Sequence, residues 1–259
     1  MRSTRPWLKD TQLPIDADAE LVVAEGKKVV LSLLASERPV IAVLAERHYY
    51  DTAFCLMLDA RGVSAECRYV ADNGLLKEVV GYRMHQGVMA IGVAPDQVAV
   101  DALQAPIVVL NGLANAENVG AIIRNCVAFG VQNLLIDSGC ASPFSRRSVK
   151  VAMGTVFGIQ WHRTESLSSA LESLSQRGVT VIAADTFVDS VSLSDYMFPS
   201  NYALVLGSEG HGLNPSVLDC VDAVVRVPMQ GNVDSLNVAA ASAVFLYHAQ
   251  HLGKCDKIS

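Results

Sequence analysis

Short apolar runs and longer amphipathic segments alternate along most of this 259-residue chain. Runs such as PVIAVLAE at 39–46 and ALVLG at 203–207 predict strands, because a strand that is buried on both faces is apolar throughout. Between such runs, apolar residues recur at intervals of three or four positions, which predicts helices. Strands that alternate with helices are typical of α/β proteins with a mostly parallel sheet.

The same pattern predicts two α/β domains. Residues 95–106 are bounded by prolines and contain isolated aspartates, which indicates a linker. Residues 1–20 combine prolines with alternating charges and predict a weakly ordered arm. A small α/β domain at 21–94 and a larger domain at 107–259, with a mostly parallel sheet, complete the predicted organisation.

In the smaller domain the pattern predicts helices at 22–35, 49–62 and 73–82 and strands at 39–46, 64–71 and 86–94. In the larger domain it predicts strands at 107–113, 133–138, 179–185, 203–207 and 224–229. Further helices are predicted at 118–130, 166–176 and 214–220 and from Ser235 onward, together with a basic loop at 143–150.

One arginine, Arg124, lies within an otherwise apolar helical segment. Asn118 is expected to cap the N-terminus of that helix, and Gly130 follows its last apolar residues as a C-terminal stop. Gly120 and Ala128 precede and follow Arg124 by one helical turn, so little side-chain bulk surrounds the guanidinium. The segment either admits a ligand or another backbone beside Arg124, or carries an ordinary solvated arginine.

Two later segments favour the first interpretation. At 202–212 the sequence YALVLGSEGHG predicts a buried strand that leads into a glycine-rich loop with one acidic residue. At 225–248 the sequence VRVPMQGNVDSLNVAAASAVFLYH predicts a strand, a loop and a helix. Together with NGLANAENVGAIIRNCVAFGV at 111–131, these segments resemble in order and spacing the three motifs of the SpoU-type RNA 2′-O-ribose methyltransferases of the SPOUT superfamily. The resemblance covers roughly residues 107–250.

This resemblance implies a C-terminal trefoil knot, a homodimer and S-adenosyl-L-methionine as the cofactor. It implies that the cofactor lies against the glycine-rich loop, the end of the next strand and the start of the last helix, at Leu206, Gly207, Gly210, Val227, Met229 and Leu236. The implied catalytic residues are Asn118, Arg124, Glu209, Ser235 and Asn237.

The chemical roles of these polar residues remain open at the level of sequence. The family assigns removal of the proton from the ribose 2′-hydroxyl to the arginine that corresponds to Arg124, although a guanidinium normally stays protonated. Arg124 therefore either loses its own proton with help from the substrate phosphate, or orients that phosphate and stabilises developing charge. Helix capping is the alternative role for Ser235 and Asn237, and backbone hydrogen bonding is the alternative for Glu209.

Two other classes of protein are weighed against this interpretation. A nucleotide-dependent oxidoreductase requires GxGxxG after the first strand, whereas the loop at 207–212 has the order GxxGxG after a late strand. A non-catalytic RNA-binding or ribosome-associated protein of the same fold has no need of all five polar residues. We therefore expect an RNA methyltransferase.

The smaller domain resembles the substrate-binding domain that precedes the catalytic domain in many SpoU-type enzymes, through Glu25-Gly26 and His85-Gln86-Gly87-Val88. A helix-to-strand turn is the alternative role for His85 and Gln86. The densest basic cluster, formed by Arg146, Arg147 and Lys150, is the expected RNA-facing patch, with solvated surface as the alternative. Such an accessory domain favours ribosomal RNA over transfer RNA as the substrate, by analogy of fold.

Composition restricts the partners and the compartment. The net charge of −6 and a pI of about 5.5 require that any RNA-binding surface is locally basic. No apolar run is long enough to span a membrane, and the first residues lack the apolar segment of a secretory signal. The six cysteines form no CxxC pair and the six histidines form no HxxxH or HExxH array. We therefore expect free thiols in a reducing cytoplasm and no metal site.

Overall fold

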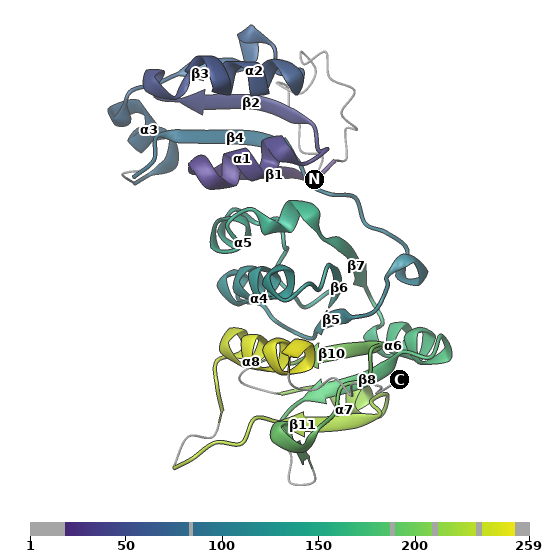
Figure 1. The fold of residues 1–259 in the computed structure, drawn as a ribbon. Coiled ribbons are helices and arrows are strands. Elements are labelled where there is room, and N and C mark those ends of the chain that lie inside the picture. The colour runs from purple at the N-terminus through teal and green to yellow at the C-terminus, as the bar shows by residue number, and fades with distance from the viewer. Residues whose placement is uncertain (1–18, 83–84, 187–189, 209–211, 232–234, 252–259) are drawn as a thin grey trace. The chain divides into compact units, whose positions relative to one another are not determined.

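The computed structural model describes residues 19–82, 85–186, 190–208, 212–231 and 235–251 (Figure 1). The chain divides into two compact units. The N-terminal unit comprises Met1–Pro95 and Phe144–Phe157, and the C-terminal unit comprises Asp96–Pro143 and Gly158–Ser259. Residues 144–157 therefore group with the N-terminal unit, although they lie within the range that the sequence pattern gives to the larger domain.

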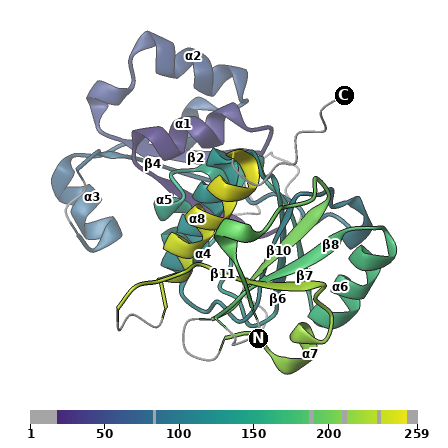
Figure 2. The same cartoon turned by 60° about the horizontal axis from the view of Figure 1, so that its bottom comes forward.

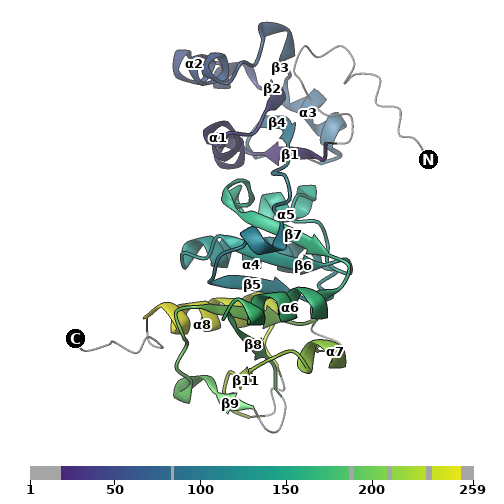
Figure 3. The same cartoon turned by 90° about the vertical axis from the view of Figure 1, so that its right-hand side faces the viewer.

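A four-stranded mixed sheet forms the centre of the N-terminal unit. Its strands follow the order β1 (Leu21–Glu25), β4 (Val88–Val93), β2 (Val40–Ala45) and β3 (Arg68–Val70). Strand β4 pairs antiparallel with β1 and β2, whereas β2 and β3 are parallel. Helices α1 (Lys27–Ala35) and α2 (Thr52–Ala60) lie on one side of this sheet and α3 (Asn73–Val80) on the other (Figure 3).

The prediction of one helix at 22–35 is wrong. Residues 21–25 form strand β1, and α1 begins only at Lys27. Val22 and Ala24 are fully buried while Val23 between them is less so, which is the alternation of a strand. Gly26 then takes a positive φ of 88°, a conformation that separates the strand from the helix. The strand predicted at 64–71 is also shorter, because a 3₁₀ turn occupies Ala65–Cys67.

The C-terminal unit contains a seven-stranded sheet in which every described pairing is parallel. The strands follow the order β7 (Gln160–Thr164), β6 (Asn133–Asp137), β5 (Ile107–Leu110), β10 (Tyr202–Leu206), β8 (Thr180–Ala184), β11 (Ala223–Arg226) and β9 (Val191–Ser192). The mixed α/β fold with a mostly parallel sheet in this part of the chain is thus confirmed. Strands β7 and β9 were not predicted, since β7 is polar in sequence and β9 has only two residues.

Helices cover both faces of the parallel sheet. Helices α4 (Ala116–Ala128) and α8 (Val238–His251) lie side by side on one face, and α6 (Leu167–Gln176) lies on the other (Figure 2). The short helix α7 (Pro215–Leu218) contacts α6. The central strands β5 and β10 are buried at every position, as expected for strands covered on both faces. No helix among the described residues is long and apolar enough to cross a membrane.

Three predicted element boundaries in the motif segments are corrected. Asn118 does not cap α4, because Asn115 is the N-cap and accepts a hydrogen bond from the backbone N–H of Glu117. The predicted basic loop contains helix α5 (Arg146–Val151), which Ser145 caps by accepting from the N–H of Ser148. The last helix begins at Val238 instead of Ser235.

Candidate functional site

A pocket of about 420 Å³ lies at the carboxyl ends of three neighbouring strands, β8, β10 and β11. Parallel α/β sheets commonly bind ligands at this edge, because loops from adjacent strands meet there. The segments after the three strands contribute Ala184–Thr186, Leu206–Ser208 and Val225–Val227 to the wall. The remaining residues come from the following loop and α8: Gly212, Met229, Ser235, Leu236, Val238, Ala241 and Phe245.

Residues predicted from the sequence motifs for cofactor binding gather in this pocket. Those that line it are Leu206, Gly207, Val227, Met229 and Leu236. The sixth predicted residue, Gly210, lies outside the described residues. Residues as distant in the sequence as Leu206 and Leu236 therefore contribute to one cavity.

The turn after β10 has no space for a side chain at Gly207. A Cβ at this position would lie 2.8 Å from the backbone carbonyl carbon and oxygen of Gly212, a distance that real Cβ atoms essentially never show. The N–H of Gly212 donates to the carbonyl of Ser208 over 3.0 Å and closes the loop. Gly207 therefore lets the loop fold back on itself and leaves backbone exposed to the pocket.

Two of the predicted catalytic residues are in direct contact at the start of α8. The side-chain amide of Asn237 donates to Oδ1 of Asn118 over 3.1 Å, and Asn118 is 8% exposed. Oδ1 of Asn237 also accepts from the N–H groups of Ala239 and Ala240, at 3.0 and 3.3 Å, so the side chain caps the helix. Ser235 lines the pocket two residues earlier. The structure thus brings Asn118, Ser235 and Asn237 to one end of α8.

Arg124 is placed differently. Its side chain is exposed on α4 and is not among the residues that line the pocket of its own chain. Within the described residues, its guanidinium has no hydrogen-bond or ion-pair partner. Glu209, the fifth predicted catalytic residue, lies outside the described residues.

Helices α4 and α8 are fixed to each other by a buried polar contact. Nδ2 of Asn125 donates to the carbonyl oxygen of Ala239 at 2.8 Å and to Oγ of Ser242 at 2.9 Å. Ser242 is fully buried and donates in turn to the carbonyl of Ala239. Because buried polar groups need partners, this contact determines how the two helices that carry Asn118 and Asn237 sit against each other.

A second network holds the loop that precedes α4. The carboxylate of Asp137 at the end of β6 accepts from Nδ2 of Asn111 at 2.6 Å and from the N–H of Gly112 at 2.9 Å. Oδ1 of Asn111 accepts from the N–H of Asn214 at 3.2 Å. Burial raises the pKa of the nearby Cys140 thiol to about 12, so this thiol stays protonated. The network ties the first motif segment to the start of α7.

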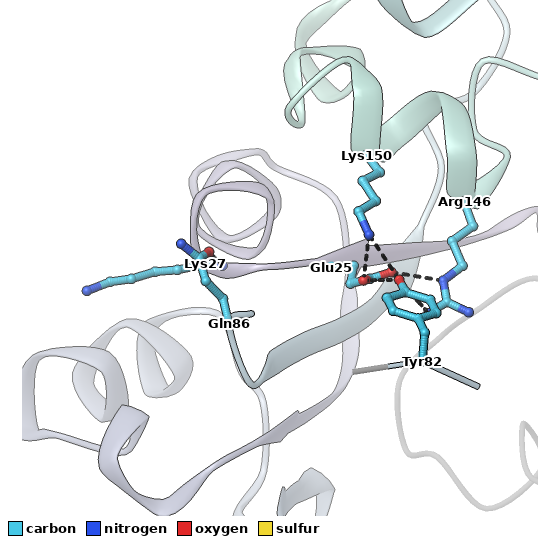
Figure 4. Close-up of polar contacts among 6 residues, drawn as sticks. All are labelled: Glu25, Lys27, Tyr82, Gln86, Arg146 and Lys150. Carbon is cyan, nitrogen blue, oxygen red and sulfur yellow. Dashed lines mark hydrogen bonds and ion pairs between the residues drawn. The ribbon is translucent and has the colours of Figure 1, made fainter. Parts of the chain in front are cut away.

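In the N-terminal unit, two members of the predicted basic cluster form ion pairs with Glu25 (Figure 4). Nη2 of Arg146 lies 3.0 Å from Oε2 of Glu25, and Nζ of Lys150 lies 2.9 Å from Oε1. The hydroxyl of Tyr82 also donates to Glu25 and accepts from Lys150 at 3.0 Å. Burial raises the pKa of Glu25, but the hydrogen bonds from Tyr82, Lys150 and Arg146 outweigh it and hold the pKa below the ordinary value of 4.5.

The structure also gives the positions of the other residues that the sequence predicted for RNA binding in this unit, Arg147, Gln86 and His85. Arg147 is exposed on α5, next to the ion-paired Arg146. Oε1 of Gln86 accepts from the backbone N–H of Lys27 over 2.8 Å, at the start of α1 (Figure 4). His85 is exposed beside it.

Sequence reasoning did not identify several pocket residues. Asp185, Thr186 and Arg226 line the pocket directly after β8 and at the end of β11, and Phe245 lines it from α8. An acid directly after a buried strand of a parallel sheet is the signal that could have identified Asp185. Among the described residues, no cluster of three potential metal ligands is present.

The fold and the pocket together define a parallel α/β protein with a candidate ligand site at the carboxyl edge of its sheet. Residues 105–247 match the model of the SpoU rRNA Methylase family. A SpoU methyltransferase from Streptomyces viridochromogenes, solved with AdoMet, has the same fold, with a TM-score of 0.75, 22% identity and coverage of 88% of this chain and 89% of that one.

Relatives with named activities agree with this classification. An uncharacterized tRNA/rRNA methyltransferase of Mycobacterium bovis is 32% identical over 240 residues, which cover 90% of this chain and 82% of the relative. A 23S rRNA (guanosine-2′-O-)-methyltransferase of Ralstonia nicotianae is 32% identical over 188 residues, which cover 69% of this chain and 74% of the relative. The chain belongs to the SpoU rRNA methylase family, as its three motifs indicated.

Proposed function

We propose that this protein transfers a methyl group from S-adenosyl-L-methionine to a ribose 2′-hydroxyl of ribosomal RNA. The observation that carries the proposal is the pocket after β8, β10 and β11, whose wall includes Leu236 and Val238 on either side of Asn237, the residue that is hydrogen-bonded to Asn118. The name of the Ralstonia relative supports ribosomal RNA, and transfer RNA is the alternative substrate. The free cysteines among the described residues support a reducing, cytoplasmic location.

The pocket fits the proposed cofactor in size and chemistry. A volume of about 420 Å³ lies within the range of roughly 300–1,000 Å³ typical of small-molecule sites. Leu206 and Leu236 offer apolar surface to an adenosine group, and Gly207 lets backbone groups approach it. Asp185 is an acid suited to a ligand that carries positive charge. When bound, S-adenosyl-L-methionine supplies a methyl group that is activated by a positively charged sulfur.

The paired asparagines are assigned to positioning. Asn118 and Asn237 fix each other through a hydrogen bond, and each belongs to a helix that is held by the Asn125 contact. A rigid amide pair can hold a ribose hydroxyl in a reactive orientation, and orientation is a large part of the rate of such a transfer. Ser235 borders the same space and is assigned to the same task.

Arg124 is assigned to the substrate phosphate and to the charge that develops on the attacking oxygen. Because Arg124 is exposed and does not line the pocket of its own chain, we assign it to the pocket of a second copy in a homodimer. Helix α8 supports such an assembly, since Ala240, Val244 and Tyr247 are exposed at helical spacing and form an apolar stripe.

RNA recognition is assigned to the N-terminal unit. Its helix α5 presents Arg147 at the surface, while Arg146 and Lys150 surround Glu25. Arg146, Arg147 and Lys150 concentrate three basic side chains on one short helix of a protein whose net charge is −6. Such a local basic surface is what phosphate contacts require.

Binding and transfer are tested separately. Isothermal calorimetry on the purified chain should detect S-adenosyl-L-methionine, and Arg124→Ala should bind it with unchanged affinity. Ribosomal RNA is prepared from cells that lack the gene and is incubated with labelled cofactor. The parent protein should transfer labelled methyl groups to this RNA, and Arg124→Ala should not. Cofactor binding without transfer to either ribosomal or transfer RNA would favour the non-catalytic alternative. Mapping 2′-O-methyl groups in both RNA classes identifies the substrate.

Mixed dimers test the placement of Arg124. A chain with Arg124→Ala has an intact pocket, and a chain with Gly207→Val has an intact arginine but no space for the loop to close. If Arg124 acts on the partner's pocket, mixing the two inactive variants restores one working site per mixed dimer. If Arg124 acts within its own chain, the mixture stays inactive.

A further inference from the structure

The acidic residue Asp185 occupies a prominent place in the pocket. It directly follows β8, and its backbone N–H donates to the carbonyl of Val225 on β11 over 3.2 Å, so the position is fixed by the sheet. The side chain is half-buried and belongs to the pocket wall. Among the described residues that line the pocket, Asp185 is the only acid.

The carboxylate has few partners within the protein. Its Oδ1 accepts from the N–H of Thr186 at 2.6 Å. Its Oδ2 lies 3.2 Å from the position that a Cβ on Gly212 would take, so it faces the glycine loop. Within the described part of the chain, no lysine, arginine or histidine lies within ion-pair distance of it.

The one basic residue among the described residues of the pocket wall has other partners. Arg226 lines the same pocket, but its Nη1 donates to the carbonyl oxygen of Ser190 and, at 3.0 Å, to the Ser190 hydroxyl. Among the described residues, the pocket therefore presents a half-buried carboxylate that has no ion-pair partner. Such a charge is costly to bury unless a positive charge joins it, and its field is stronger there than in water.

We infer that Asp185 recognises the positive charge on the sulfur of the methyl donor and makes the pocket prefer S-adenosyl-L-methionine over its demethylated product. The inference rests on the proposed function. The donor and S-adenosyl-L-homocysteine share the adenosine and amino-acid groups, and they differ in one methyl group and one positive charge. A carboxylate in the pocket attracts the positively charged sulfur of the donor and has no such attraction for the product. S-adenosyl-L-homocysteine is therefore released more readily than S-adenosyl-L-methionine.

The effect of removing this charge can be estimated. Charges in a partly buried site are less screened than in water, so loss of the carboxylate charge is expected to change the affinity for the donor by about tenfold. Asp185→Asn keeps the shape of the side chain and the acceptor for the Thr186 N–H, so only the charge is lost.

The experiment measures two dissociation constants by calorimetry, for S-adenosyl-L-methionine and S-adenosyl-L-homocysteine, on four proteins: the parent chain, Asp185→Asn, Asp185→Glu and Asp195→Asn. Asp195 is an exposed aspartate outside the pocket and controls for overall charge. We expect Asp185→Asn to bind the donor about tenfold more weakly and the product within about twofold of the parent. Asp195→Asn should leave both constants unchanged, and Asp185→Glu should retain the preference for the donor.

Two results would overturn the inference. An equal loss of affinity for both ligands assigns the carboxylate to the shared ribose hydroxyls or amino group, and unchanged affinity for both removes it from recognition. In either case the parent chain still binds the donor, so the proposed function stands. If the parent chain binds neither ligand, the proposed function fails together with the inference. Thermal unfolding of each variant confirms that the compared proteins are folded.

Discussion

The side-chain amide of Asn237 donates to the side-chain oxygen of Asn118 across 3.1 Å, although 119 positions separate the two residues. Asn118 is buried in α4, and Asn237 caps the start of α8. The pair joins the first and third sequence motifs beside the pocket, so Asn237 acts as a helix cap and as a partner of Asn118 at the same time.

Asn237→Ser separates these two roles. Serine caps helices as well as asparagine does, but it is too short to reach Asn118. We expect the unfolding free energy to fall by about 1 kcal/mol because the hydrogen bond to the buried Asn118 is lost while the cap is kept. Methyl transfer should fall by about tenfold or more because the pair is lost. Asn237→Ala, which also loses the cap, should destabilise the protein by about 1 kcal/mol more.

The matched test is a double-mutant cycle with Asn118→Ala, measured as kcat for methyl transfer. Since the two side chains act as one pair, the second substitution should add little to the first. Fully additive losses would show that the two asparagines act independently.

Asn125→Ala should weaken the joint between α4 and α8. The substitution removes the donor to both Ala239 and Ser242, and the Ser242 hydroxyl is fully buried. Loss of hydrogen bonds to buried groups costs about 1–3 kcal/mol, which urea unfolding can resolve. Gln176→Ala on the exposed side of α6 is the control and should change stability by less than about 0.5 kcal/mol. Equal effects of the two substitutions would show that the buried contact is not important for stability.

The Glu25 cluster predicts a dependence of stability on pH. The folded state holds the pKa of Glu25 below the ordinary value of 4.5. Ionised Glu25 therefore stabilises the fold above pH 4.5, and this contribution is lost as the pH falls through the folded-state pKa. Arg146 and Lys150 are 40% and 41% exposed, and solvent screening limits the contribution to about 1 kcal/mol.

Comparison with Glu25→Gln isolates this contribution. Unfolding free energies of the parent and the variant should differ above the ordinary pKa of 4.5 and converge as the pH falls below the lowered folded-state pKa of Glu25. Glu66→Gln, at an exposed position of the same unit, should show no such convergence. A difference that stays constant from pH 3 to about pH 7 would indicate that Glu25 acts through its shape instead of its charge.

The sequence predicted the pocket better than it predicted element boundaries. The resemblance of the motifs to a known family implied that Leu206, Gly207 and Met229 lie at one cofactor site, and all three line the same pocket. The first strand was predicted as helix because a short apolar run has no distinctive period, and only burial of alternate residues distinguishes it. The cap was placed at Asn118 instead of Asn115 because an asparagine at either position can cap a helix, so the sequence alone does not distinguish them.

Contacts between distant segments were beyond the reach of sequence patterns. The ion pairs of Glu25 with Arg146 and Lys150 join residues 121 and 125 positions apart, and no local motif encodes such a pair. Asp185 likewise belongs to no local sequence motif. Its place in the pocket follows only from the structure, in which the segments after β10 and β11 lie beside it.

The apolar stripe on α8 leads to the last prediction, which concerns assembly. Val244 is 41% and Tyr247 is 49% exposed, and the Tyr247 ring lies edge-on to Phe129 of the neighbouring segment, with ring centroids 6.1 Å apart. A charge inside an apolar interface is costly to bury, so Val244→Arg should prevent dimer formation. Equilibrium sedimentation should give 27.7 kDa for the variant and twice that mass for the parent.

The control places the same change on another exposed helix. Val79 on α3 is 56% exposed, and Val79→Arg should leave the dimer intact. If Arg124 serves the partner's pocket, Val244→Arg should also lose methyl transfer while it keeps its affinity for S-adenosyl-L-methionine, because the pocket itself is built from one chain. A monomeric variant with full activity would show that one chain carries the complete site, and a parent chain that sediments as a monomer would refute the assembly itself.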